Sequence, residues 1–144
     1  MLAMWLFALS TKPWTLVCGG DIMLNGVSPT AGALRGVRNL FSRADIAYAN
    51  LEIPLTTARS ATNRKSKADL KARRQFVLKA DPAHAAALDA IGLDVVSLGN
   101  NHAMDYGPAG LTEMIGLLDQ RAIAYAGAGK DLAAAQLPAS LQVP

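Results

Sequence analysis

Short apolar runs alternate along most of this chain with stretches whose apolar residues recur at helical spacing. The runs over residues 14–18, 45–49, 94–98 and 122–126 predict four β-strands, because each is short and bounded by glycine, proline or polar residues. Residues 33–43 and the stretches that begin at Asp81 and Pro108 predict amphipathic helices. This alternation with short links predicts an α/β fold with a mainly parallel sheet covered by helices.

The two later helices carry recognisable start signals. Asp81-Pro82 combines a capping carboxylate with proline at the first helical position, and Pro108 opens the last helix in the same way. The apolar face of that last helix is predicted to comprise Leu111, Met114, Ile115 and Leu118. Between the second strand and Asp81, ordered structure is expected to resume at residues 76–78.

Residues 56–74 are polar and basic and lack a clear apolar period, which predicts a long surface loop. Seven of the 14 lysines and arginines lie here against a single acidic residue, so the net charge of +3 arises from this segment, and the rest of the chain carries a net charge of −3. A solvated loop is the favoured interpretation, and a lid that attracts a phosphate or an anionic polymer is the alternative. Nucleic acid is not expected as a partner, because no aromatic residues interleave the basic ones.

Composition limits the domain organisation. A chain of 144 residues that is 51% hydrophobic has the size of one compact domain, and 17% charged residues do not indicate disorder. We assign residues 1–13 to a short apolar N-terminal segment and residues 14–144 to the domain. Residues 1–9 are too few to cross a bilayer and lack a basic start, which leaves an anchor remnant, a start-site artefact or a strand. Cys18 is the single cysteine and is expected to be a small buried residue.

Polar side chains follow three of the predicted strands, at the point where each strand ends. In open α/β sheets, ligands bind beyond the carboxyl ends of the strands, so these side chains are expected to converge there. The candidate site residues are Asp21 after the first strand, Asn50 and Glu52 after the second, and Asn100, Asn101, His102 and Asp105 after the strand over residues 94–98.

The chemistry of this set is that of a divalent-cation site. Carboxylate and amide oxygens are ligands for such cations, and an imidazole binds metal or transfers a proton. Alternatively, Asp and Asn after strands only cap helices or close turns, and Asp105 is expected to form a loop more than to bind metal. His102 lies in a loop bounded by glycines and is a functional candidate, whereas His84, on an alanine-rich helix, is expected to be structural. The Gly127-Ala128-Gly129 run is too short for a dinucleotide fingerprint.

Taken together, these motifs resemble the bacterial poly-γ-glutamate capsule synthesis protein family (CapA/PgsA type), which belongs to the calcineurin-like metallophosphatase superfamily. The similarity runs with gaps from about residue 14 to the end of the chain. The matching stretches are residues 20–24, 49–55, 76–82, 94–107 and 123–134. The resemblance implies the N-terminal portion of a metallophosphatase-like layered sandwich.

The resemblance also implies roles for individual residues and for the whole protein. Asp21, Glu52 and Asn101 match metal-binding positions, His102 matches the catalytic acid, and the implied cofactor is a divalent metal, Mn, Mg, Fe or Zn. The implied substrate is a phosphoester or an anionic polymer, with membrane-bound synthase subunits as partners. A cell-envelope or membrane-associated location follows from the same family, and a cytoplasmic location stays open.

Two features differ from the metallophosphatase pattern. Met23 stands where the first motif generally supplies a histidine, and the chain ends before the later histidine-bearing loops, so we expect a truncated domain. A truncated sheet exposes a strand edge, which predicts self-association. Two functions remain in view: a metal-dependent phosphoesterase-like hydrolase completed by later loops, and a non-catalytic envelope module that binds an anionic polymer or synthase partners.

Overall fold

The fold is built on one four-stranded parallel sheet. The computed structural model describes residues 13–30, 32–62 and 64–142. The strands are β1 (Leu16–Ile22), β2 (Ile46–Leu51), β3 (Val95–Ser97) and β4 (Ala124–Ala126), and they lie side by side in that order. Every neighbouring pair is parallel, which confirms the predicted α/β class with a parallel sheet.

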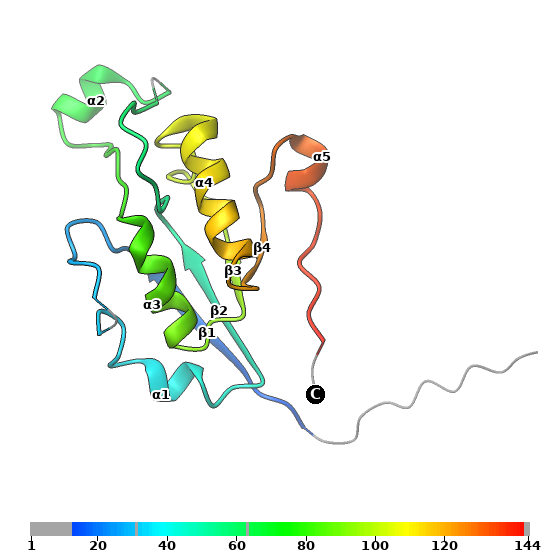
Figure 1. Ribbon diagram of the computed structural model, residues 1–144. Helices are drawn as coiled ribbons and strands as arrows, with labels where there is room; N and C mark the ends of the chain where they lie inside the picture. The colour runs from blue at the N-terminus through cyan, green and yellow to red at the C-terminus, as the bar shows by residue number, and fades with distance from the viewer. Residues whose placement is uncertain (1–12, 31, 63, 143–144) are drawn as a thin grey trace, which may run out of the picture.

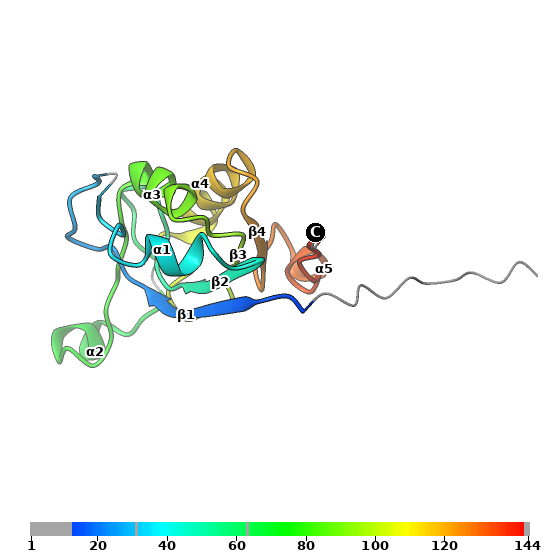
Figure 2. The same cartoon turned by 90° about the horizontal axis from the view of Figure 1, so that it is seen from below.

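Helices cover one face of this sheet. Helices α1 (Arg38–Phe41), α3 (Ala85–Ala90) and α4 (Gly107–Asp119) lie on the same side, as Figures 1 and 2 show. In β2 the side chains of Ala47, Ala49 and Leu51 point to that side and are fully buried, whereas the alternating residues are half-buried. The hydrophobic core therefore lies between the sheet and this helical layer.

The first strand is longer than its apolar run predicts. The predicted strand over residues 14–18 is followed by Gly19 and Gly20, but β1 continues through these glycines to Ile22. The register with β2 shifts between Cys18 and Asp21, where β1 holds one residue more than its partner, so the glycines form a bulge inside the strand. Pairing with β2 outweighs the local turn preference of the glycines.

Two further predictions are wrong near the start of the domain. The helix expected over residues 33–43 shrinks to the four residues of α1, which has no side-chain cap and follows a stretch containing Gly32 and Gly36. Cys18 is exposed, not buried, because β1 is an edge strand and Cys18 alternates with Gly19, which faces Phe41 of α1.

The basic segment of residues 56–74 contains a short helix that its sequence pattern did not predict. Helix α2 (Lys67–Lys71) projects from the rest of the fold, and its N-cap Ser66 accepts a hydrogen bond from the backbone of Asp69. Residues 76–78 are ordered without forming a strand, and an isolated bridge joins Leu55 to Ala80 a little further on.

The two predicted helix starts are confirmed. Asp81 accepts a hydrogen bond from the backbone of Ala83 at 2.8 Å, and a 3₁₀ turn (Pro82–His84) leads into α3. His84 is fully buried with Nε2 3.0 Å from the carbonyl oxygen of Val27, in keeping with a structural histidine. A last short helix, α5 (Leu132–Ala135), follows β4.

Some sequence predictions fall outside what the structure covers. The apolar segment of residues 1–13 lies, apart from Pro13, outside the described residues. Within the described ranges, none of the helices has the length and apolar character needed to cross a membrane. In the same part of the chain, β1 and β4 each pair with one neighbour only, so both edges of the sheet are unpaired, and self-association through them stays a prediction.

Candidate functional site

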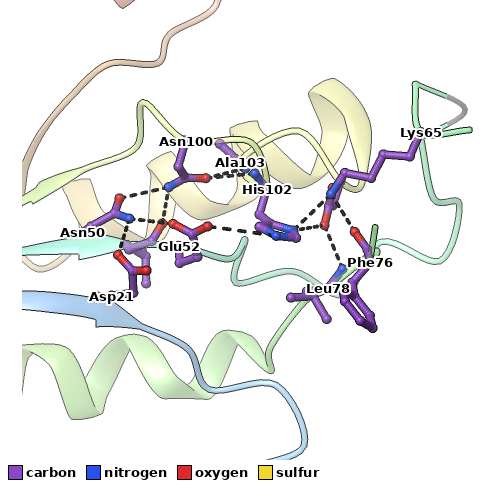
Figure 3. A network of polar contacts seen from close by, with 11 residues as sticks. Asp21, Asn50, Glu52, Lys65, Phe76, Leu78, Asn100, His102 and Ala103 are labelled. Atoms are coloured by element: carbon purple, nitrogen blue, oxygen red, sulfur yellow. Dashed lines mark hydrogen bonds and ion pairs between the residues drawn. The ribbon is translucent and has the colours of Figure 1, made fainter. Parts of the chain in front are cut away.

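The carboxyl ends of β1, β2 and β3 bring polar residues together at one edge of the sheet (Figure 3). Asp21 lies opposite Asn50 in the β1–β2 register, and Asn50 lies opposite Ser97 in the β2–β3 register. The loops that leave β2 and β3 carry Glu52 and Asn100 to the same place. The sheet topology therefore produces the convergence that the sequence predicts.

Asn50 is the centre of the first half of this network. Its Nδ2 donates to Oδ1 of Asp21 at 2.8 Å and to Oε2 of Glu52 at 2.5 Å, so one amide group bridges two carboxylates. Its Oδ1 accepts a hydrogen bond from Nδ2 of Asn100 at 3.1 Å. An amide N–H pair thus occupies the position between two negative charges where a cation would also be stabilised.

Asn100 joins this group to the loop that carries the histidine. Besides contacting Asn50, its Nδ2 donates to the carbonyl oxygen of Leu51 at 3.0 Å. Its Oδ1 accepts from the backbone N–H groups of His102 and Ala103, at 3.0 and 2.9 Å. One side chain therefore holds the end of β2 and the His102 loop in a fixed relation, which is the turn-closing role that short amides perform well.

The ring of His102 is oriented by Asp105. Nδ1 lies 2.7 Å from Oδ2 of Asp105, whose side chain is 1% exposed. Because an ionised carboxylate only accepts hydrogen bonds, a neutral ring that donates to Asp105 carries its proton on Nδ1 and leaves the lone pair of Nε2 free. Nε2 lies 3.9 Å from Oε1 of Glu52, too far for a hydrogen bond. Asp105 does shape the loop, as predicted, and it also sets the direction of the imidazole.

Most of the predicted site residues belong to one network, but Asn101 stands apart. The network contains Asp21, Asn50, Glu52, Asn100, His102 and Asp105. Asn101 is exposed, and its side chain makes no hydrogen bond with any residue in the described part of the chain. Of the two adjacent asparagines it is Asn100 that organises the site, and whether Asn101 binds a metal stays a prediction.

One member of the site, Lys65, was not predicted from the sequence. Lys65 reaches Asp105 from the basic segment, with Nζ 2.5 Å from Oδ1. Nothing in the spacing of the basic residues separates Lys65 from its neighbours, because its partner lies forty positions later in the chain. A basic residue that alternates with polar ones in a loop gives no sign of burial.

Glu113 on α4 anchors the beginning of the basic segment. Its carboxylate accepts hydrogen bonds from the hydroxyl of Thr56 at 2.5 Å and from the backbone of Thr57 at 2.9 Å. Burial alone would raise the pKa of Glu113, but these hydrogen bonds and the nearby charge of Lys79 outweigh it and lower the pKa below its usual 4.5. The segment thus starts from a point fixed to the core.

The donor set only partly fits a metal ion. Two carboxylates, an imidazole with a free Nε2 and side-chain amides are the right types of ligand. Within residues 13–30, 32–62 and 64–142, however, no three His, Cys, Asp or Glu side chains are grouped closely enough to hold a metal. The described residues therefore supply only part of a metal-binding set. Glu52 lies near His102, and Asn50 joins Glu52 to Asp21.

Comparison with known proteins gives a consistent result. The model of a family described as bacterial capsule synthesis protein matches residues 15–144. An uncharacterized protein of Sinorhizobium fredii is 28% identical over 127 residues, which are 85% of this chain and 26% of that protein. A probable polyglutamine synthesis accessory protein of Mycobacterium tuberculosis is 31% identical over 115 residues, or 80% of this chain and 27% of that protein. The chain spans about a quarter of the length of these curated relatives.

Proposed function

Because this chain belongs to the bacterial capsule synthesis protein family, we propose that it carries part of a cation-assisted phosphoesterase-like site within an accessory protein of poly-γ-glutamate synthesis. The family match bears out the resemblance seen in the motifs, and it supports a capsule-related role for the chain. The observation that carries the finer proposal is the convergence of Asp21, Glu52 and His102 at the carboxyl ends of neighbouring parallel strands.

His102 is the proposed catalytic acid. Asp105 holds Nδ1, so Nε2 is the nitrogen that faces the carboxylates of the site. A ring that carries a second proton would present Nε2–H to a leaving oxygen bound at this edge of the sheet. Asp105 is a positioning residue in this scheme, because it touches the ring and not the substrate. In other acid–base sites, likewise, a carboxylate binds one ring nitrogen of a histidine and the other nitrogen transfers the proton.

Asp21 and Glu52 are the proposed cation ligands, with Asn50 or Asn101 supplying an amide oxygen. When bound, a divalent cation would polarise a phosphoryl oxygen and lower the cost of the charge that develops there. Turning the Asn50 amide would exchange its Nδ2, which now bridges the carboxylates, for Oδ1. Because this chain aligns with only about a quarter of the length of each relative, we propose that the remaining ligands lie in segments found in the longer proteins.

The proposed substrate is a phosphoester or an anionic polymer, and the proposed partners are membrane-bound synthase subunits at the cell envelope. These proposals rest on the family. The relative from Mycobacterium tuberculosis is named as a probable accessory protein of polyglutamine synthesis, and this name supports the proposal that the protein acts together with a synthase. The metal would be Mn, Mg, Fe or Zn, since hard carboxylate oxygens with one imidazole are compatible with each of them.

A non-catalytic module that binds an anionic polymer is the second candidate. The observation in its favour is the exposed positive charge around α2, which projects from the fold (Figure 2). The exposed basic residues of this segment are Arg59, Arg64, Lys67, Lys71, Arg73 and Arg74. A flexible polyanion would be attracted to such a surface without any catalytic group.

Hydrolysis of a chromogenic phosphodiester in the presence of Mn²⁺ tests the enzyme proposal. His102→Ala is expected to lower the rate by about 10²–10⁴, the usual contribution of a general acid. Asp89→Asn, which changes an exposed carboxylate on α3, is the matched control and should leave the rate unchanged. A rate that is equal in His102→Ala and the unmodified chain would exclude His102 as the acid.

Binding of poly-γ-glutamate at low salt tests the second candidate. Replacing Arg73 and Arg74 by glutamine should weaken the binding, whereas replacing the equally exposed Arg43 and Lys130 should not. Equal weakening by both pairs would mean that net charge, and not the basic segment, attracts the polymer.

A further inference from the structure

Lys65 differs from the other basic residues of its segment in being packed into the fold. Its side chain is 11% exposed, against 66% for Arg74. Nζ lies 2.6 Å from the carbonyl oxygen of Phe76 and 2.5 Å from Oδ1 of Asp105 (Figure 3). A lysine with no specific role would extend into solvent, since ordering and desolvating its ammonium group costs free energy.

Asp105 is the point at which three separate segments meet. Oδ1 pairs with Lys65, and Oδ2 accepts from the backbone of Leu78 and from the ring of His102, each at 2.7 Å. Its carbonyl oxygen accepts from the backbone of Thr62 at 2.8 Å. Among the described residues, Lys65 is the only lysine or arginine paired with this carboxylate, so it alone balances a charge that is 1% exposed.

We infer that Lys65 is a positioning residue for His102. The ammonium group holds Oδ1 of Asp105, which turns Oδ2 toward Leu78 and the imidazole. Lys65 Nζ lies 3.0 Å from Nδ1 of His102. With the proton on Nδ1, the ring N–H donates to Oδ2 of Asp105, while the ammonium group of Lys65 forms an ion pair with Oδ1 of the same carboxylate. The ion pair therefore fixes both the place of the carboxylate and the face that the ring presents to Glu52.

The same contact connects the basic segment to the site. Lys65 lies two residues before Lys67, where the exposed helix α2 begins. The ion pair thus holds the chain just before that helix beside the His102 loop. That His102 is a reacting group rests on the proposed function, but the positioning of its ring by Lys65 does not.

The tautomer of His102 is the direct readout. Long-range ¹H–¹⁵N spectra at pH 8.5, where an ordinary histidine is neutral, distinguish a proton on Nδ1 from one on Nε2. The chain has two histidines, so the signals of His102 are assigned by their loss in His102→Gln. The unmodified chain and Lys67→Met, an exposed control on α2, should show a single tautomer with the proton on Nδ1.

Lys65→Met should shift both ring nitrogens toward the average of the two tautomers, because Asp105 is then free to turn. A spectrum of Lys65→Met that matches the unmodified chain would overturn the inference. If Lys65→Met does not fold, the rates at which the lysine amines of the unmodified chain are acetylated test the inference instead. Lys65 should then react about ten times more slowly than Lys67, because its ammonium is paired and buried. Equal reactivity would overturn the inference as well.

Titration with Mn²⁺ separates this inference from the proposed function. Because Lys65 contacts Asp105 and His102 and none of the proposed cation ligands, Lys65→Met should bind Mn²⁺ about as tightly as Lys67→Met. If the unmodified chain binds no Mn²⁺, the proposed cation site fails while the tautomer result still stands. If Lys65→Met binds Mn²⁺ much more weakly than Lys67→Met, Lys65 supports the whole site and the specific positioning role fails.

Discussion

Gly19→Ala is expected to destabilise the domain and to disturb the site at the same time. A Cβ atom at this position would lie 2.8 Å from Cζ of Phe41 and 3.4 Å from Cβ of Ala49. Phe41 is 6% exposed, so its ring has to tilt within a packed region to make room. Adding a methyl group to a filled core typically costs about 1–3 kcal/mol, a substantial part of the roughly 5–15 kcal/mol that holds a domain together.

Gly20→Ala is the matched control, one residue further along the same strand. A Cβ atom at Gly20 would meet nothing within 4 Å. Alanine in a backbone conformation that it tolerates restricts the unfolded chain, so this variant should be unchanged or up to about 1 kcal/mol more stable. The two variants share composition and differ only in what the new methyl group touches.

Urea unfolding followed by circular dichroism measures the difference between the two variants. The midpoint of Gly19→Ala should fall clearly below that of the unmodified chain, while that of Gly20→Ala should not fall. Because Asp21 follows two residues later, Gly19→Ala should also weaken the contact between Asp21 and Asn50. Equal midpoints for the two variants would refute the claim that close approach of Phe41 to the bulge sets the position of β1.

Three further perturbations follow from the site and its surroundings. Asn50→Asp puts a third carboxylate beside the two that the amide now bridges. Without divalent cations, the free energy of unfolding should fall by about 1–2 kcal/mol and the melting temperature by about 3–8 °C. Mn²⁺ should restore the melting temperature. Glu113 has a pKa lowered by folding, so its contribution to stability is present above pH 4.5 and is lost as the pH falls through the folded-state pKa. Glu113→Gln should therefore lower the free energy of unfolding at pH 7 more than at pH 3, measured by urea unfolding at both values. Cys18 is exposed and should react with a thiol reagent in the folded chain as fast as it does in urea, and protection on folding would contradict the placement of β1.

The four strands and the convergence of the site were predictable from local patterns, although the end of β1 was not. Apolar runs followed by Asp21, by Asn50 and Glu52, and by Asn100 mark places where buried strands give way to polar side chains. Parallel order then brings these places together without further information. The helix starts at Asp81 and Pro108 were equally readable, because a capping carboxylate and a proline in the first turn are local signals.

What the sequence did not reveal depends on contacts between distant segments. The bulge at Gly19 and Gly20 exists because β1 pairs with β2, and that pairing is not visible in the glycines themselves. Cys18 is exposed because it lies on the face of the sheet opposite the one that helices α1, α3 and α4 cover. The burial of Lys65 follows from Asp105, forty positions away. In each case tertiary structure overrides a reasonable local preference.

The central claim is that Asp21 and Glu52 form part of a divalent-cation site, and calorimetric titration of Mn²⁺ into the folded chain tests it most directly. We expect saturable binding that is lost in Asp21→Asn and in Glu52→Gln and is retained in Asp89→Asn, whose carboxylate is exposed on α3. The absence of binding to the folded chain, or binding that all three variants retain equally, would contradict the claim and favour a module that binds an anionic polymer through its basic segment.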